Sequence, residues 1–185
     1  MSHATLNDLS GAVRVRASQD GDMPAIAAIY AHHVLHGTAS FETEAPSLEE
    51  MIRRRAEILS RGLPYLTAEA DGAVLGYAYA GPYRPRAAYR NTVEDSVYLR
   101  PDLAGRGIGK HLLPAVIAAC EQRGLRQMVA VVGDSANTAS VRLHQAFGFR
   151  LVGVLETVGF KHGKWLDTVL LQRSLGPGHT AEPQR

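Results

Sequence analysis

Short stretches of alternating apolar and polar residues recur along the chain, a pattern typical of half-buried β-strands. Seven stretches either alternate in this way or form a short apolar run between turn residues: 13–17, 65–70, 73–81, 92–99, 127–133, 149–160 and 164–175. The run at 127–133 is almost wholly apolar, which predicts a central strand. Asp71-Gly72 separates two of the stretches by two residues and predicts a tight hairpin, and His162-Gly163 separates the last two.

Four other stretches carry apolar residues at the spacing of an amphipathic helix. They run over 22–37, 47–62, 107–124 and 137–148. Asp22 and Ser47 are the expected N-caps, and Glu50 follows Ser47 at the distance of a capping box. Gly148 is expected to close the last helix. Pro114 lies inside the third helix, where it should remove a hydrogen bond or bend the axis.

The expected order of elements is β-α-α-β-β-β-α-β-α-β-β. Hairpins imply antiparallel pairing and the β-α-β unit implies a parallel pair, so we predict a mixed α/β (α+β) fold rather than an alternating dinucleotide-binding sheet. The chain shows no internal repeat and no low-complexity linker. We therefore expect one domain at 13–175, with flexible tails at 1–12 and 176–185.

Composition indicates a globular protein and narrows its partners. Hydrophobic residues make up 45% of the chain and charged ones 21%, as in soluble domains. The formal net charge of +2 is too small to imply a nucleic-acid partner. No apolar run could span a bilayer and no signal sequence opens the chain, so neither a membrane nor export is expected. The single cysteine, Cys120, is expected to be a small buried hydrophobe in a reducing cytoplasm rather than a nucleophile.

The stretch EDSVYLRPDLAGRGIGKHLL, residues 94–113, places three glycines between a strand and a helix. Backbone N–H groups at a helix start bind anions, and glycine lets a phosphate approach the backbone. Gly105, Gly107 and Gly109, with the basic Arg106 and Lys110, therefore predict a pyrophosphate site. The dinucleotide fingerprint fails because residue 110 is not glycine, and the Walker pattern fails because residue 111 is not Ser or Thr. The alternative is a glycine-rich turn that only starts the helix.

This loop and a second segment resemble the GCN5-related N-acetyltransferases, the GNAT superfamily. The loop AGRGIG is similar to the family's (Q/R)-x-x-G-x-(G/A), with Ala104 where Gln or Arg is usual. NTASVRLHQAFGFRLVG resembles the family's second signature, with His144 where many members carry tyrosine. YAGPYRPRAAYRNTVEDSVYL, SFETE and VGFKHGKWLD resemble the phosphinothricin and methionine sulfoximine acetyltransferase branch. The resemblance covers 13–175 and implies the GNAT fold, a mixed, mostly antiparallel seven-stranded sheet flanked by about four helices.

The resemblance also implies acetyl-CoA as co-substrate. The strand before the glycine loop is expected to hydrogen-bond the pantetheine arm, and one of its N–H groups is expected to hold an oxyanion. The implied cofactor-binding residues are Val97, Tyr98, Leu99, Ala104, Gly105, Arg106, Gly107, Ile108, Gly109, Lys110, Asn137 and Ser140.

Glu94 is the first candidate for a catalytic role. An amine that attacks a thioester arrives mostly as an ammonium, and a carboxylate can take its proton directly or through one water. Glu94 lies on the strand before the glycine loop and matches the branch's catalytic glutamate. Its neighbour Asp95 should point to the opposite face of a regular strand. The alternative for Glu94 is an exposed strand carboxylate.

His144 is the second candidate. A histidine titrates near neutrality, so it could help to remove the amine's proton or supply one to the departing thiolate. The alternative is a partly buried helical histidine satisfied by a backbone carbonyl.

The implied acceptor is a small amino-acid-like molecule with a second anionic or polar group. Arg84, Arg86 and Tyr89 are its expected contacts, since arginine binds carboxylate or phosphinate through paired donors. The alternative is a solvated basic loop. Other implied residues lie in a front loop and in the closing hairpin: Phe41, Glu44, Val158, Gly159, Phe160 and Trp165. In relatives that hairpin contributes to a dimer and reaches the neighbouring pocket, so a homodimer is expected.

A metal site is not expected. His32 and His36 lie one helical turn apart, with His33 beside them, but no carboxylate or cysteine accompanies them as a further ligand.

Three functions remain open on the sequence. The first is acetylation of the α-amine of a phosphinothricin-like or methionine sulfoximine-like compound, with Glu94 as general base. The second is acetylation of another acceptor, such as a different amino acid, a polyamine or a protein N-terminus. The third is a non-catalytic acyl-CoA-binding module, against which the presence of both Glu94 and His144 argues.

Overall fold

The computed structural model describes residues 12–183. The expected N-terminal tail lies outside these residues apart from residue 12. All seven expected strands form one sheet in the order β1-β2-β3-β4-β5-β7-β6. Only β4 and β5 pair in parallel. The strands are β1 Arg14–Ala17, β2 Tyr65–Ala70, β3 Ala73–Pro82, β4 Thr92–Leu99, β5 Gln127–Gly133, β6 Arg150–Lys161 and β7 Lys164–Ser174.

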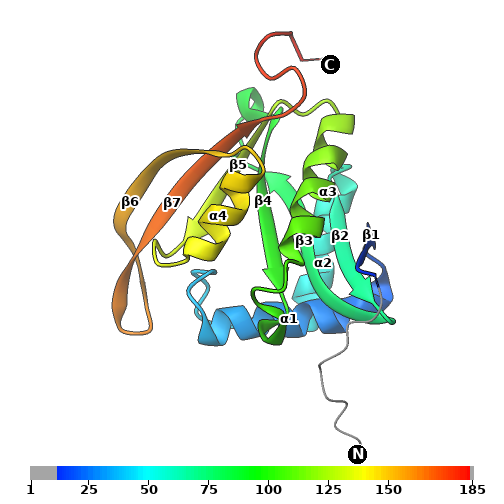
Figure 1. Cartoon of the computed structure of the whole chain (residues 1–185), viewed down its shortest axis with the longest axis vertical. Helices are drawn as coiled ribbons and strands as arrows, with labels where there is room; N and C mark the ends of the chain where they lie inside the picture. Colours follow the sequence, from blue (N-terminus) through cyan, green and yellow to red (C-terminus); the bar gives the residue numbers. More distant parts are fainter. Residues whose placement is uncertain (1–11, 184–185) are drawn as a thin grey trace, which may run out of the picture.

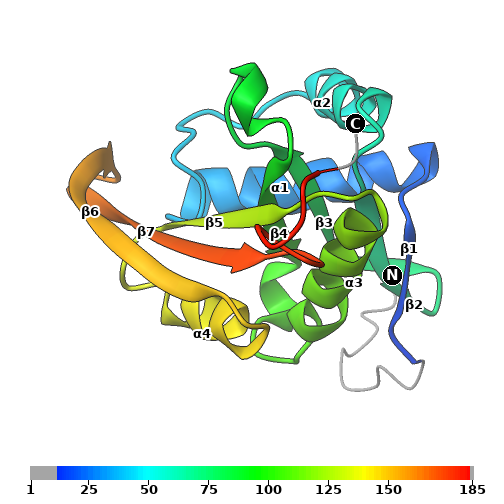
Figure 2. The ribbon, with the colours of Figure 1, turned by 90° about the horizontal axis from the view of Figure 1, so that it is seen from above.

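The described chain has four α-helices: α1 Met23–His36, α2 Leu48–Ser60, α3 Gly109–Gln122 and α4 Thr138–Ala146. Helices α1 and α2 cover one face of the sheet, while α3 and α4 cover the other (Figures 1 and 2). Each face has its own core. Leu112 of α3 packs with Ala78 on one side, and Ile26 of α1 packs with Tyr65 and Tyr77 on the other. The mixed, mostly antiparallel seven-stranded sheet with four flanking helices, expected from the resemblance, is confirmed.

Ser47 caps α2 as expected, but the reciprocal half of the capping box is absent. The Ser47 Oγ accepts the N–H of Glu50 at 3.1 Å. The Glu50 carboxylate binds Arg53 and Arg54, each at 2.8 Å. The guanidinium groups attract this carboxylate more strongly than a neutral backbone N–H does.

Asp22 lies at the N-cap position of α1, as expected, but its side chain makes no capping hydrogen bond to the helix. It accepts instead from Arg16 Nη1 at 2.7 Å, from the Gln19 N–H at 2.8 Å and from Thr67 Oγ1 at 3.2 Å. The carboxylate therefore joins β1 and β2 to the start of α1.

The third helix begins later than expected, at Gly109 rather than Gly107. Gly105 and Gly107 have φ of 77° and 82°, a left-handed conformation that cannot belong to a right-handed helix. Pro114 is accommodated inside α3, which continues to Gln122. Because proline has no N–H, the Lys110 carbonyl has no helical donor four residues on.

The turn glycines behave as the sequence predicts. Asp71-Gly72 has φ of 50° and 75°, and His162-Gly163 has 51° and 74°. Two consecutive positive φ values match the type I′ turn that joins twisted antiparallel strands. Residues 176–183, placed in a tail by the sequence, hydrogen-bond to the domain: Arg126 Nη2 donates to the Glu182 carbonyl at 2.8 Å.

The central parallel pair opens partway along its length. Pairing of β4 with β5 ends at Asp95 and Ala130, although β4 continues to Leu99 and β5 to Gly133. Beyond this point β4 stays paired with β3, and β5 stays paired with β7. The sheet therefore has a V-shaped opening near its middle.

The β6–β7 hairpin projects at one edge of the molecule (Figure 1). Its register shifts between Leu155 and Gly159, and Thr157 at the shift has φ of 53°. The Thr157 N–H donates to Asp167 Oδ1 at 3.0 Å, which holds the bulge in place. Several large apolar side chains of this hairpin are exposed: Leu151, Val152, Val154, Leu155, Val158, Phe160 and Trp165.

Candidate active site

A cleft of about 780 Å³ lies where β4 and β5 part. Its walls come from the ends of these strands, the glycine loop and α4. It brings together most of the expected cofactor residues: Val97, Tyr98, Leu99, Ala104, Gly105, Gly107, Gly109, Lys110, Asn137 and Ser140. Ile108 and Arg106 do not line the cleft; Ile108 is buried in the core and Arg106 is exposed.

The glycine loop presents backbone N–H groups at the start of α3. Among the described residues, no backbone acceptor binds the N–H groups of Gly105, Gly107 or Ile108. A Cβ on Gly105 or Gly107 would meet nothing within 4 Å, so the positive φ is what requires glycine there. At Gly109 the requirement is packing, since a Cβ would lie 2.9 Å from Leu143 Cδ2 of α4. The loop has the geometry of an anion-binding helix start.

The end of β4 turns main-chain groups toward the opening. The Arg100 N–H donates to the Leu75 carbonyl of β3 at 2.9 Å. Alternate residues of an antiparallel strand face opposite edges, so the N–H groups of Val97 and Leu99 face the side that β5 has left. His33 Nε2 reaches the Leu99 carbonyl on that side, at 2.8 Å.

Glu94 lies on β4 just before this opening, on the face of the sheet that α1 and α2 cover. Its strand neighbours are Gly81 and Val129. Within residues 12–183, the Glu94 carboxylate makes no hydrogen bond or ion pair. Burial raises the pKa of Glu94, the neighbouring charge of Asp95 raises it further, and Arg84 partly lowers it. The carboxylate is thus a better proton acceptor than an ordinary surface glutamate.

Asp95 faces the opposite side of β4, as expected, and meets His144 of α4. The His144 Nε2 lies 2.9 Å from Asp95 Oδ2, and its Nδ1 lies 2.7 Å from the Ser140 carbonyl. Both side chains are almost fully buried, with exposures of 5% for His144 and 1% for Asp95. Burial lowers the pKa of His144, but the hydrogen bond and charge of Asp95 outweigh it and leave the pKa raised. Both residues line the cleft.

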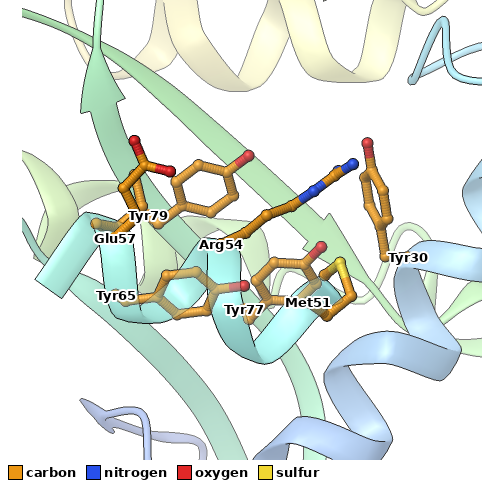
Figure 3. Close-up of a pocket in the computed structure, with 8 residues that line it drawn as sticks. Tyr30, Met51, Arg54, Glu57, Tyr65, Tyr77 and Tyr79 are labelled. Atoms are coloured by element: carbon orange, nitrogen blue, oxygen red, sulfur yellow. The ribbon is translucent and has the colours of Figure 1, made fainter. Parts of the chain in front are cut away.

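A second cavity of about 220 Å³ lies under α2 on the face that carries Glu94. Figure 3 shows the residues that line it: Met51, Arg54 and Glu57 of α2, Tyr30 of α1, and tyrosines of β2 and β3. Those tyrosines are Tyr65, Tyr77 and Tyr79. Tyr98 separates this cavity from the cleft, since its ring stacks on Tyr77 at 5.4 Å and meets Tyr30 edge-on at 5.1 Å.

Arg54 crosses the mouth of this second cavity toward Tyr30 (Figure 3). Its guanidinium is already paired, at 2.6 Å with Glu42 and at 2.8 Å with Glu50. The Tyr30 O–H also donates to Glu42, at 2.8 Å. Burial raises the pKa of Tyr30 to about 12, so this phenol stays neutral at physiological pH.

The expected anion contacts lie in the exposed loop between β3 and β4. Arg84 stacks over Tyr83 at 5.2 Å, and Tyr83 meets Tyr89 edge-on at 5.7 Å. Arg84 is close enough to Glu94 to lower its pKa. Arg86 precedes the short 3₁₀ turn Ala87–Tyr89 and is exposed. The loop thus places one cation, Arg84, near the candidate base.

Phe41 does not line either cavity. Its ring lies against two glycines, because a Cβ on Gly159 would be 2.3 Å from Phe41 Cε2 and one on Gly133 would be 3.0 Å from Cε1. The expected acceptor contacts Val158 and Phe160 flank Gly159 and are 54% and 59% exposed. The front loop and the closing hairpin therefore meet each other in one chain, but Phe41, Val158 and Phe160 do not line the cleft.

Sequence reasoning overlooked two parts of this site. The first is the role of Asp95. Alternation along β4 places its carboxylate on the same core face as Val93 and Val97, and a charged residue in an apolar row could have indicated a buried partner. The second is the tyrosine-lined cavity, because tyrosines at 65, 77 and 79 fit an ordinary strand pattern equally well.

Within residues 12–183, no group of three or more His, Cys, Asp or Glu side chains is arranged to hold a metal ion. No helix in the same range is long and apolar enough to cross a membrane.

Comparisons with known proteins agree with the geometry. The model of the acetyltransferase (GNAT) family matches residues 19–149. A phosphinothricin N-acetyltransferase of Alcaligenes faecalis is 58% identical over 94% of this chain and 88% of the relative. An L-methionine sulfoximine/L-methionine sulfone acetyltransferase of Pseudomonas paraeruginosa is 41% identical over 90% and 97%. A phosphinothricin acetyltransferase from Sinorhizobium meliloti, solved in complex with AcCoA, has a TM-score of 0.91 at 45% identity and 94% coverage of both chains.

Proposed function

This chain belongs to the acetyltransferase (GNAT) family, and from that premise we propose that it transfers the acetyl group of acetyl-CoA to the α-amine of a small amino-acid-like acceptor. The acceptor is of the phosphinothricin or methionine sulfoximine type, as the names of the similar relatives suggest. The observation that carries the proposal is the cleft that runs from the glycine loop to the opening of β4 and β5 beside Glu94.

The cleft fits the coenzyme in chemistry as well as in size. The N–H groups of Gly105, Gly107 and Ile108 would hold the pyrophosphate, with Lys110 adding positive charge. The N–H groups of Val97 and Leu99 are available to the pantetheine arm. When bound, acetyl-CoA would supply a thioester whose acyl carbon forms the new C–N bond as the C–S bond breaks. Coenzyme A would leave as a thiolate and take up the second proton that the nitrogen loses.

Glu94 acts as the general base. It takes a proton from the acceptor's ammonium, either directly or through one water, so that the nitrogen lone pair is free to attack. A main-chain N–H at the end of β4 stabilises the negative charge on the acetyl oxygen during the attack. Arg84, Arg86 and Tyr89 bind the acceptor's anionic groups beside Glu94.

We also propose a homodimer in the cytoplasm. The exposed apolar side chains of β6 and β7 support the dimer, since monomers rarely leave such a surface uncovered. In a dimer Val158 and Phe160 would reach the neighbouring acceptor site. The single buried thiol, Cys120, suits a reducing compartment.

Release of free thiol from acetyl-CoA, measured with a panel of amines, tests the main proposal. We expect fast release with phosphinothricin or methionine sulfoximine, and slower release with polyamines and peptide N-termini. Arg86→Ala should raise KM for the phosphinate acceptor by about tenfold, the equivalent of one ionic hydrogen bond. Coenzyme binding in calorimetry without thiol release for any amine would leave only a binding module, and the proposal would be wrong.

A further inference from the structure

The contact between Asp95 and His144 constrains where protons lie. The Ser140 carbonyl has only lone pairs to offer, so the His144 Nδ1 at 2.7 Å must carry a hydrogen. The Asp95 carboxylate also only accepts, so the Nε2 at 2.9 Å must carry one too. Imidazole is a stronger base than a carboxylate by about 2.6 pKa units, which places the shared proton on the histidine. A ring with both nitrogens protonated is an imidazolium.

Such a ring has no means of moving the acceptor's proton. A general base needs a free lone pair, and neither nitrogen of an imidazolium has one. A proton donor must point its N–H at the group that receives the proton, and both N–H groups are committed to Ser140 and Asp95. With only 5% of its side chain exposed, the ring cannot turn away without breaking both bonds.

We propose that Asp95 is a positioning residue: it holds His144 as a doubly hydrogen-bonded imidazolium, which removes the histidine from proton transfer and leaves that task to Glu94. The pair also joins two parts of the site. Asp95 follows Glu94 directly on β4, and His144 belongs to α4, whose first turn supplies Asn137 and Ser140 to the cleft. One buried bond thus ties the strand with the base to the helix beside the coenzyme.

Neighbouring segments place titratable, polar or aromatic groups around the Asp95–His144 pair or next to it. From β4, Asp95 faces His144; from α4, the Ser140 carbonyl does so; and the Phe149 ring lies edge-on at 5.0 Å. From α3, Cys120 lies near Asp95. Burial raises the pKa of the Cys120 thiol most, and the charge of Asp95 raises it further. After the larger effect of burial, the negative charge of Asp95 raises the pKa of Glu94. A positive ring on the far side of Asp95 would offset part of that charge, by Coulomb's law.

The proposal rests on the proposed acetyl transfer for its kinetic test but not for its spectroscopic one. In the full chain with ¹⁵N-labelled histidine, long-range ¹H–¹⁵N spectra would report the protonation of each ring, and His144→Gln identifies the His144 signals. We expect both nitrogens of His144 to be protonated at pH 7.5, above the ordinary histidine pKa of about 6.5. In Asp95→Asn the ring should be neutral at that pH. A neutral His144 in the wild-type protein would overturn the proposal even if the chain proved to acetylate nothing.

The kinetic test compares the acidic limb of kcat/KM in two conservative variants. Asp95→Asn removes the charge next to Glu94 that raises its pKa, together with the weaker opposing charge of the more distant ring, so the limb should move to lower pH. His144→Gln keeps a donor for Asp95 but leaves its charge without compensation, so the limb should move to higher pH. At its own optimum, His144→Gln should keep kcat within about tenfold of the wild type, since general acid–base groups contribute 100-fold or more.

Two outcomes of the kinetic test would overturn the proposal. A loss of 100-fold or more in His144→Gln would place the histidine in proton transfer. Losses in both variants without movement of the limb would reduce the pair to a structural contact. Asp20→Asn and His36→Gln are matched controls at exposed positions away from the cleft, and both should leave the limb and the His144 spectrum unchanged. Absence of thiol release in every protein, with the expected spectra, would count against the acetyl-transfer proposal alone.

Discussion

Glu94 and Asp95 show how two adjacent carboxylates acquire different roles from the alternation of a strand. Glu94 lies half-buried beside Gly81, without a hydrogen-bonding partner in the described chain, so burial raises its pKa. Asp95 points to the opposite face of the sheet, where it contacts His144 at 2.9 Å and is almost fully buried. The unpaired carboxylate is suited to accept a proton, while the paired one is suited to hold a geometry.

We predict that Glu94→Gln lowers kcat by about 10²–10⁴-fold with little change in coenzyme affinity. The same change should stabilise the fold at neutral pH. A carboxyl whose pKa is raised by folding is harder to ionise in the folded state, so its ionisation costs stability as pH rises through that pKa, and glutamine avoids this. Thermal unfolding at pH 4 and pH 8 should show the variant's advantage only at the higher pH. Glu156→Gln, at an exposed position of β6, should show neither effect.

The glycine loop and the N-terminal clamp are features of elements rather than of single residues. The loop connects β4 to α3, and two of its glycines have the positive φ angles that give it its shape. The clamp joins β1, β2 and α1 through Asp22, with Arg16 also bonded to Glu69 at 2.7 Å. Each is a place where backbone or charge geometry connects neighbouring elements.

We predict that Gly107→Ala weakens acetyl-CoA binding by about tenfold, measured by calorimetry. Alanine at a φ of 82° is strained by about 1–2 kcal/mol, and the loop would relieve the strain by shifting its N–H groups. Gly72→Ala is the matched control, with a φ of 75° and equally open space but a place in the β2–β3 turn. Both variants should lose similar stability; equal losses of coenzyme affinity would contradict a specific role for the loop.

We predict an acid-dependent loss of stability from the clamp. The Arg16 hydrogen bond, supported by the Gln19 N–H against the cost of burial, lowers the pKa of Asp22 from 3.8 to about 2. A lowered pKa stabilises the fold fully above the unfolded value, and this contribution, about 2 kcal/mol, is lost as pH falls through the folded value. Denaturant unfolding between pH 5 and pH 2 should show the loss in the wild type but much less of it in Asp22→Asn. Asp71→Asn, in an exposed turn, should follow the wild type.

At the scale of the whole molecule, the opening between β4 and β5 connects the two layers. The glycine loop and α4 border it on one face, while His33, Ser96 and Tyr98 border it on the face of α1 and α2. A coenzyme can therefore enter from one side of the sheet and present its thioester to an acceptor on the other. The β6–β7 hairpin lies beyond this opening at the edge of the sheet.

We predict a dimer with twice the 20.0 kDa mass of one chain in sedimentation or light scattering at micromolar concentration. Phe160→Glu should shift it toward the monomer, because a charge would be desolvated in an apolar interface. Leu59→Glu is the control: Leu59 is 42% exposed on α2, and its replacement should leave the mass unchanged. A wild-type monomer at these concentrations would contradict the proposed assembly.

The sequence determined the elements, because hydrophobic periodicity and turn residues act over a few positions. All seven strands, four helices and both type I′ hairpins were predictable, as was the glycine loop. The family resemblance extended this to the fold and to most of the cleft lining. Local patterns failed where a partner from another element competed, as when Arg16 bound the Asp22 carboxylate that was expected to cap α1.

Only the tertiary structure decided the partners of His144 and the place where the sheet opens. Asp95 and His144 are 49 positions apart in the chain, and their bond depends on α4 packing across β4. The parting of β4 from β5 depends on each strand keeping its other neighbour. Such effects arise from contacts between elements. The hydrophobic pattern of one segment does not identify the distant segment that will contact it.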